Sequence, residues 1–255
     1  MAKERILISG GSGYIGSKLI QFLSKKGFEC KKIPRNNFSN LDCDYMIHCA
    51  ADYTSKADNI LYQANFLYGD KIFSNLLNTS CKKIINLSSF SEFGDHENRE
   101  PINKYAQYKA MLRKKWEHAS NFDFISLVIY DVYGEDDKRN KLVNSLLRLK
   151  QGDAFELSHG RQYVDFVYIE DVCNSVLRSI KELGSGLYGV RTEQKTLREQ
   201  ISFIEELQQI KLNFKEEIHP EILRPRFDFK NINELKTNFK KQYTDLWELH
   251  ERNNT

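Results

Sequence analysis

The sequence predicts an α/β fold, a doubly wound parallel sheet with a small C-terminal lobe. Short apolar runs alternate with longer segments whose apolar residues recur at helical spacing, and the first run ends in a glycine cluster. Strands that alternate with helices form a parallel sheet, because each helix must cross a face of the sheet before the next strand begins. The chain has 255 residues, of which 40% are hydrophobic, so it can fill a core of this size.

The first half of the chain carries the regular alternation. Residues 5–9 form a short apolar run, which is typical of a buried strand. Residues 14–26 carry apolar side chains at helical spacing, and Gly27 supplies a C-terminal cap. The same criteria predict further strands at 45–49, 83–87 and 124–130, and helices at 58–78 and 103–119.

The second half is less regular. Helical patterns recur at 138–151, 169–183 and 197–210, with strand-like pieces at 163–168 and 187–190. We expect residues 1–165 to form a main domain, residues 166–190 to return to it, and residues 191–255 to form a small lobe. Such a lobe would lie beyond the carboxyl ends of the strands, where open α/β sheets bind their ligands.

Composition excludes several classes of protein. The 38 basic and 35 acidic residues leave a net charge of +3, so neither a nucleic acid nor a membrane surface is an expected partner. The five cysteines are irregularly spaced, which argues against disulfides and metal sites and favours a reducing compartment. No signal peptide opens the chain, and no window reaches the roughly 20 apolar residues of a membrane helix. We therefore expect a cytoplasmic protein.

A glycine-rich turn joins the first predicted strand to the first predicted helix. Glycines at positions 10, 13 and 16 allow a tight turn, close approach of a pyrophosphate, and close packing of the helix on the strand. The N-terminus of the helix then offers free N–H groups to the phosphates. The pattern predicts a Rossmann-like dinucleotide site with contacts from Gly10, Ser12, Gly13, Tyr14, Ile15 and Gly16.

The second strand favours NADP(H) over NAD. NAD-binding folds of this kind commonly place a carboxylate at the end of that strand, to bind the ribose 2′-hydroxyl. Here the segment ends in Ile33, Pro34 and Arg35, and a guanidinium can instead bind a 2′-phosphate. NAD remains an alternative, because Arg35 is also compatible with an ordinary surface position.

Three polar residues form a candidate catalytic centre. Tyr105 and Lys109 are four residues apart on a predicted helix, so they share one face. The Lys109 ammonium would stabilise the Tyr105 phenolate and lower its pKa toward the range of a general acid. Ser89 follows the strand predicted at 83–87, so it emerges at the edge of the sheet where the ligand should lie.

Taken together, these motifs resemble the extended short-chain dehydrogenases/reductases, especially the nucleotide-sugar epimerases, dehydratases and 4-ketoreductases. The resemblance covers about residues 5–183. It rests on the glycine turn and on six further segments: His48-Cys49-Ala50-Ala51, Asn65-x-x-x-Gly69, Ser89 before Gly94, Pro101-x-x-x-Tyr105-x-x-x-Lys109, Asp131-Val132-Tyr133-Gly134, and 162–168 with Asp171-Val172. The resemblance implies cofactor contacts at Ala50, Ala51, Asp131 and Val132, and a supporting role for Asn65 beside the cofactor.

Departures from the family pattern narrow the chemistry. Family dehydratases carry an Asp-Glu pair directly after the catalytic Ser or Thr, whereas Phe90 and Ser91 occupy those positions here and Glu92 comes one place late. Dehydration is therefore disfavoured. Val164 and Val128 replace arginines that are common in the family, so Arg161 or another group would have to bind the substrate diphosphate. These departures concern the substrate site and do not affect Ser89, Tyr105 or Lys109.

The resemblance implies an NADPH-dependent reductase of a nucleotide-linked sugar, with the C4 ketone of a 4-keto-6-deoxyhexose as its substrate and cell-surface polysaccharide synthesis as its context. Tyr105 would donate the proton, Ser89 would polarise the carbonyl, and Lys109 would support both the phenol and the nicotinamide ribose. Two alternatives stay open: a 4-epimerase with tightly bound NAD, and a non-catalytic NADP-sensing protein. A homodimer through the helices at 58–78 and 103–119 is a further expectation.

Overall fold

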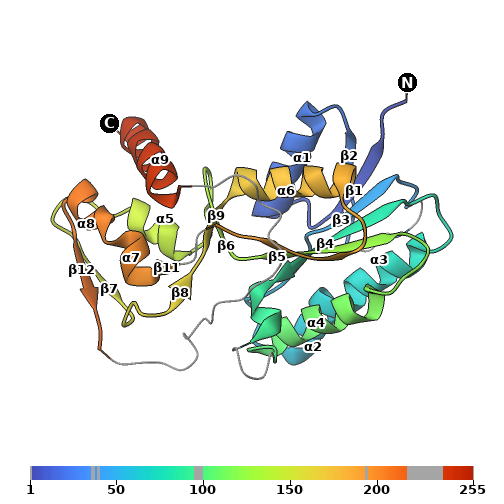
Figure 1. Ribbon diagram of the computed structural model, residues 1–255, viewed down its shortest axis with the longest axis horizontal. Coiled ribbons are helices and arrows are strands. Elements are labelled where there is room, and N and C mark those ends of the chain that lie inside the picture. The colour runs from blue at the N-terminus through green and yellow to red at the C-terminus, as the bar shows by residue number, and fades with distance from the viewer. Residues whose placement is uncertain are drawn as a thin grey trace.

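The computed structural model describes residues 2–35, 38, 41–94, 100–192, 195–216 and 238–254. These residues form two lobes side by side (Figure 1). The larger lobe is built on a parallel sheet and carries the N-terminus, and the smaller lobe carries the C-terminal helix α9 (Phe239–Asn254). The predicted α/β fold with a doubly wound parallel sheet is confirmed.

The sheet of the larger lobe has six parallel strands in the order β10-β5-β4-β3-β1-β2. They are β1 (Arg5–Ser9), β2 (Glu29–Lys32), β3 (Tyr45–His48), β4 (Lys83–Ser89), β5 (Asp123–Ile129) and β10 (Gly186–Val190). The chain leaves β1 toward one edge to form β2 and then returns to the other side of β1 to form β3. Open α/β sheets bind ligands at such a reversal of strand order, beyond the carboxyl ends of the strands.

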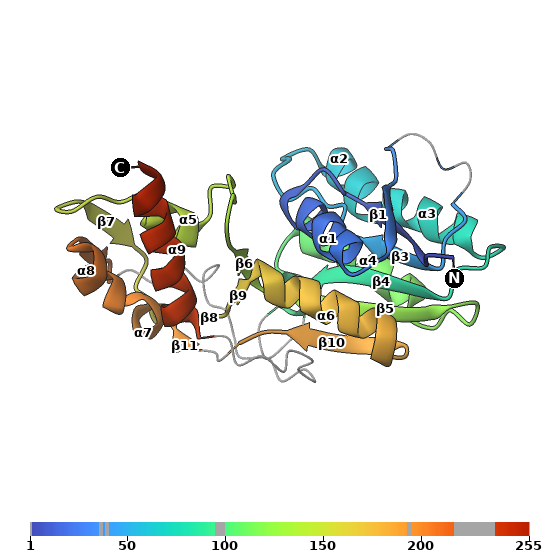
Figure 2. The ribbon, with the colours of Figure 1, turned by 90° about the horizontal axis from the view of Figure 1, so that it is seen from above.

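Helices cover both faces of this sheet (Figures 1 and 2). Helices α1 (Tyr14–Lys25) and α6 (Ile169–Glu182) lie on one face, and α2 (Asp58–Tyr62), α3 (Tyr68–Leu76) and α4 (Lys104–Trp116) lie on the other. A hydrophobic core lies on each face of the sheet, one beneath α1 and α6 and the other beneath α3 and α4. In strand β1, Ile6 and Ile8 point into the first of these cores and Leu7 points into the second, as the two-residue period of a strand requires.

The helix predicted at 58–78 is interrupted by a π-helical turn, η1 (Gln63–Leu67). Asn65 lies in this turn and is 1% exposed. Its Nδ2 donates to the carbonyl oxygens of Asp52 and Leu61, at 2.7 and 2.9 Å, and its Oδ1 accepts from Asp52 N at 3.0 Å. The turn therefore directs one amide side chain onto the loop that follows β3, which helical periodicity could not reveal.

The smaller lobe has its own hydrophobic core, which includes Leu146, Ile201 and Tyr243. Two short strands, β6 (Asp131–Tyr133) and β9 (Phe166–Tyr168), pair at its junction with the sheet. Its other elements are α5 (Leu142–Leu147), β7 (Ala154–Leu157), β8 (Tyr163–Val164), β11 (Lys195–Thr196), α7 (Leu197–Ile201), α8 (Phe203–Gln208) and β12 (Lys211–Phe214).

The division of the chain differs from the expected boundary at residue 165. Residues 142–157 and Val164 belong to the smaller lobe, because their apolar side chains pack in its core and not against the sheet. The chain leaves the sheet after β5, builds part of the smaller lobe, returns through α6 and β10, and leaves again. Of the expected lobe at 191–255, residues 193–194, 217–237 and 255 lie outside the described residues.

Candidate active site

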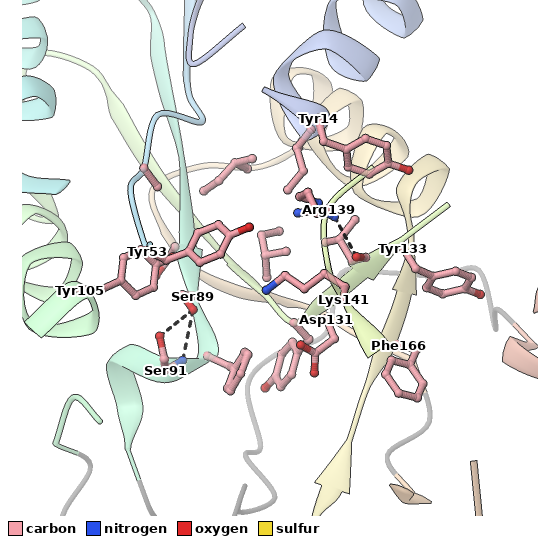
Figure 3. Close-up of a pocket in the computed structure, with 18 of the residues that line it drawn as sticks. Tyr14, Tyr53, Ser89, Ser91, Tyr105, Asp131, Tyr133, Arg139, Lys141 and Phe166 are labelled. Atoms are coloured by element: carbon pink, nitrogen blue, oxygen red, sulfur yellow. Dashed lines mark hydrogen bonds between the residues drawn. The ribbon is translucent and has the colours of Figure 1, made fainter. Parts of the chain in front are cut away.

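A cavity of about 620 Å³ lies where the carboxyl ends of the sheet strands face the smaller lobe (Figure 3). Gly10 follows β1, Cys49 follows β3, Ser89 ends β4 and Tyr130 follows β5, and all four line this cavity. The smaller lobe contributes the opposite wall, with Leu142, Val143, Gln162, Val164, Phe166 and Leu197. The cavity therefore lies at the reversal of strand order, the place expected for a ligand.

The glycine turn is shaped to admit a diphosphate. Gly10 has a φ of +66°, and a Cβ atom added there would lie 2.7 Å from Ala50 N. A Cβ atom on Gly16 would overlap the carbonyl oxygen of Gly10. Helix α1 begins at Tyr14 with no side-chain cap, so the N–H groups of its first turn are open to a ligand. These features fit the pyrophosphate of a dinucleotide at a helix N-terminus.

The predicted cofactor residues divide into two groups. Eight of the twelve line the cavity: Gly10, Gly13, Tyr14, Ile15, Gly16, Ala51, Asp131 and Val132. Four do not. Ser12 is exposed on the turn, Ala50 packs behind Gly10, and Asn65 is buried beneath the loop after β3. Arg35 is exposed beyond β2, near enough to Asp52 and Tyr68 to act electrostatically on both.

Ser89 is held where β4 turns into the short 3-10 helix η2 (Phe90–Phe93). Its side chain caps η2 by accepting a hydrogen bond from Ser91 N at 3.3 Å, and its Oγ lies 2.8 Å from Ser91 Oγ. Its backbone N–H donates to Glu92 Oε1 at 3.1 Å. The hydroxyl is therefore fixed at the strand end and faces the cavity, where Figure 3 shows it beside Ser91.

Tyr105 and Lys109 lie one turn apart on α4 and both line the cavity, so the predicted pair and Ser89 share one site. Lys109 is 5% exposed, and its Nζ donates to the carbonyl oxygen of Leu87 at 2.7 Å. Lys109 Nζ lies 5.9 Å from the centre of the Tyr105 ring. The edge of the Tyr53 ring packs on the same phenol, with ring centres 6.3 Å apart.

The electrostatics differ from the sequence-based expectation. The sequence predicts that Lys109 lowers the pKa of Tyr105, but burial raises the pKa of this phenol, and the charge of Glu92 raises it further. A hydrogen bond with Ser89 acts in the opposite direction. Burial likewise lowers the pKa of Lys109, and the charge of Glu92 opposes that effect. Burial and the charge of Glu92 therefore dominate, and Tyr105 is held in its protonated form.

The structure also adds residues that the sequence did not single out. Arg139 and Lys141 come from the loop between β6 and α5 and line the cavity. The Arg139 guanidinium lies 4.6 Å from the centre of the Tyr14 ring, and Lys141 Nζ lies 4.5 Å from the centre of the Tyr53 ring. No motif marks these two cations, because they reach the site only through the fold of a loop.

Arg139 is firmly anchored. Its Nε and Nη2 donate to the two carboxylate oxygens of Asp137 at 2.8 and 2.7 Å, and Nη2 also donates to the carbonyl oxygen of Val132 at 3.0 Å. Within the described part of the chain, its Nη1 has no hydrogen-bond partner. The guanidinium is thus held in place with one nitrogen still able to donate.

The two valines that replace common arginines are placed differently. Val164 lines the cavity, whereas Val128 is fully buried in β5 and does not. Arg161, the suggested replacement, is exposed and does not line the cavity. Arg139, which lines the cavity, is therefore better placed than Arg161 to contact a ligand there.

The described residues lack the features of a metal centre and of a membrane-spanning helix. Their His, Cys, Asp and Glu side chains include no group of three or more that is arranged to hold a metal ion. None of their helices is both long enough and apolar enough to cross a membrane.

The chain is similar in sequence to two CDP-abequose synthases. CDP-abequose synthase from Yersinia pseudotuberculosis is 26% identical, covering 94% of this chain and 98% of the relative. CDP-abequose synthase from Salmonella muenchen is 24% identical over 73% of this chain and 74% of that protein.

Solved structures share the fold. A UDP-glucose 4-epimerase from Thermotoga maritima with UDP-glucose superposes with a TM-score of 0.81 at 16% identity, covering 98% of this chain and all of that one. RMD from Pseudomonas aeruginosa complexed with NADPH gives a TM-score of 0.76 at 19% identity, covering 97% of this chain and 100% of that one.

A family model assigns the chain directly. The model of the NAD dependent epimerase/dehydratase family matches residues 6–189, which contain the glycine turn, Ser89, Tyr105 and Lys109. This match confirms the family to which the motifs pointed and the predicted class of NAD(P)-dependent enzyme. The chain belongs to the NAD dependent epimerase/dehydratase family.

Proposed function

We propose that this protein uses NADPH to reduce a keto group on a nucleotide-linked sugar, with the C4 ketone of an NDP-4-keto-6-deoxyhexose as substrate, in the synthesis of cell-surface polysaccharide. The observation that carries the proposal is the meeting of Ser89, Tyr105 and Lys109 in one cavity with the glycine turn. The names of the two CDP-abequose synthases support a nucleotide sugar as the substrate class.

The three polar residues divide the reaction among them. The Ser89 hydroxyl binds the carbonyl oxygen, and Tyr105 transfers its proton to that oxygen as the carbon is reduced. Bound NADPH supplies the hydride, so the ketone becomes a secondary alcohol and NADP⁺ is formed. Lys109 then favours the phenolate that is left behind, through its charge, and the proton is replaced from solvent.

The structure supports a reductase over a dehydratase. A dehydratase would need an additional acid and base beside the sugar, but the side chains that follow Ser89 are Phe90 and Ser91. The Phe90 ring stacks on Tyr130 with ring centres 5.6 Å apart, so it forms an apolar wall of the cavity. The phenyl ring of Phe90 can neither abstract a proton from carbon nor protonate a leaving hydroxyl, whereas ketone reduction requires only the Tyr105 proton.

Arg139 and Lys141 are the groups that we assign to the substrate diphosphate. A diphosphate needs charge-assisted donors, and the strand position held by Val164 offers none. Arg139 keeps Nη1 available while its other donors are engaged, and Lys141 lies on the same wall. This assignment places the diphosphate opposite the sheet and leaves the sugar between it and Tyr105.

The central experiment is a screen of purified protein for NADPH oxidation with UDP-, dTDP-, CDP- and GDP-linked 4-keto-6-deoxy sugars. Turnover with one of them is expected, together with a preference for NADPH over NADH that falls about tenfold in Arg35→Ser. Protein that retains NAD through purification and interconverts C4 epimers would instead identify an epimerase. NADPH binding without turnover on any of these sugars would favour the non-catalytic alternative.

A further inference from the structure

A buried ion pair lies directly behind the catalytic side chains, and the proposed reaction does not use it. Glu92 of η2 is 2% exposed and Arg113 of α4 is 7% exposed, and Arg113 Nε lies 3.1 Å from Glu92 Oε2. Burying two charges costs desolvation energy that their attraction seldom exceeds by much. A pair in this position is therefore poorly explained by stability alone.

One oxygen of Glu92 is directed at the strand end that carries Ser89. Glu92 Oε1 accepts from Ser88 Oγ at 2.5 Å and from Ser89 N at 3.1 Å. These bonds complete the capping arrangement at the start of η2, in which the Ser89 side chain caps the helix and the Glu92 side chain returns to the Ser89 backbone. Glu92 thus holds the backbone of Ser89, whose hydroxyl is in turn bonded to Ser91.

The other oxygen of Glu92 ties η2 to α4. Tyr105, Lys109 and Arg113 follow one another at four-residue intervals, so they share one face of α4. Arg113 also packs on the Phe93 ring, 5.0 Å from its centre, and its Nη1 binds Glu117 at 2.6 Å. The ion pair therefore holds the helix that carries Tyr105 against the turn that carries Ser89.

The charge of Glu92 also reaches both titratable catalytic groups. It raises the pKa of Tyr105, after burial, and it supports the charged form of Lys109 against burial. The other groups facing Tyr105 are Ser89 and Tyr53, and Lys109 lies beneath its ring. Those facing Glu92 are Arg113 on α4 and Ser88 and Ser89 on β4.

We propose that Glu92, held by Arg113, is a positioning residue of the catalytic centre. It fixes the backbone of Ser89 at the end of β4 and, through Arg113, holds the helix that carries Tyr105 against that strand end. The inference rests on the proposed function, because it takes Tyr105 as the proton donor. The inference predicts that removal of the Glu92 charge lowers the pKa of Tyr105, although Glu92 makes no hydrogen bond to Tyr105.

The test uses protein labelled with ¹³C at the tyrosine Cζ, in which the Tyr105 resonance is the one missing from Tyr105→Phe. In Glu92→Gln, that resonance should titrate at a pH lower by about half a unit or more than in the wild type. The matched control is Glu117→Gln, which removes a carboxylate from the same guanidinium on the side away from Ser89. The Tyr105 resonance of this control should follow the wild-type curve.

The inference is overturned if the Tyr105 resonance has the same pH dependence in Glu92→Gln and wild type, or if Glu117→Gln shifts it equally. If Glu92→Gln alone does not fold, Glu92→Gln combined with Arg113→Gln removes both charges and is read in the same way. The NMR titration needs no substrate. A failed turnover screen, or full turnover by Tyr105→Phe, would therefore count against the proposed function while the titration still decides the role of Glu92.

A kinetic readout accompanies the titration once a substrate is known. Glu92→Gln should lower kcat and move the alkaline limb of its pH profile to lower pH, while NADPH affinity stays as in the wild type. If Glu92 had only a structural role, Glu92→Gln would lower kcat, NADPH affinity and thermal stability together. The pH profile of kcat would then be the same as in the wild type.

Discussion

The two lobes that line the cavity place their side chains by different means. On the sheet side, Ser89 and Tyr130 lie at the ends of the paired strands β4 and β5, and Gly10 follows β1 in the same sheet, so their positions follow from strand register. On the other side, Arg139 and Lys141 come from a loop and are held by side-chain contacts. A rigid ladder suits groups that must meet a reacting atom, and a loop suits groups that determine which substrate enters.

The comparison is tested most strongly at Tyr105. Tyr105→Phe should lower turnover by about 10² to 10⁴-fold, because it removes the general acid, with little change in NADPH affinity. Initial rates and NADPH fluorescence titration measure the two quantities. Tyr108→Phe is the matched control on the same helix, since the Tyr108 hydroxyl binds Asp58 Oδ1 at 2.7 Å, away from the cavity lining. Equal losses in both variants would contradict the assignment of the acid.

The next largest effect is expected at the glycine turn. Gly10→Ala should weaken NADPH binding at least tenfold, because its Cβ would lie 2.7 Å from Ala50 N and its φ of +66° is unfavourable for alanine. Gly184→Ala is the control, since a Cβ atom there has no neighbour within 4 Å. Calorimetric titration with NADPH compares them. Unchanged affinity in Gly10→Ala would mean that the turn does not receive the diphosphate.

A smaller effect is expected on the loop side. Arg139→Gln should raise the KM for the nucleotide sugar about tenfold, because it removes a charged donor, while kcat changes little. Arg161→Gln, which alters an exposed arginine outside the cavity, should leave KM unchanged. The opposite result, with KM raised only in Arg161→Gln, would move the diphosphate site to Arg161. A loss of kcat in Arg139→Gln would instead mean that the loop side also takes part in the reaction, which contradicts the proposed difference between the lobes.

The smallest effect concerns the junction of the lobes. Burial raises the pKa of Asp165 to about 6, although Thr192 N and Oγ1 donate to its Oδ1 at 2.7 and 2.6 Å. Its ionised form is therefore disfavoured in the folded state. The stability that depends on the protonated carboxyl is complete below about pH 4 and is lost as the pH rises through about 6.

Asp165→Asn removes this titration and should flatten the pH dependence. The wild type should lose about 2 to 3 kcal/mol relative to the variant between pH 4 and 7, which corresponds to a difference in Tm of about 5 °C. Thermal unfolding at several pH values measures it. A constant difference in Tm across that range would show that the pKa of Asp165 is not raised in the folded protein.

The elements of the sheet, and the meeting of the three candidate catalytic residues, could be predicted from the sequence. Strand β1 and the start of α1 lie where the apolar pattern placed them, and Ser89, Tyr105 and Lys109 line one cavity. These features depend on local regularities: the period of a strand or helix, a glycine at a tight turn, and the four-residue interval that puts two side chains on one face. Such regularities can be read along the chain.

Other features were decided only by the tertiary structure. The pKa of Tyr105 is raised and not lowered, because burial and the charge of Glu92 both disfavour the phenolate. Glu92 and Arg113 meet although they are far apart in sequence, and Arg139 reaches Tyr14 from a loop of the other lobe. Sequence spacing sets which residues share an element, but desolvation and contacts between elements depend on how those elements pack, and no local period encodes that packing.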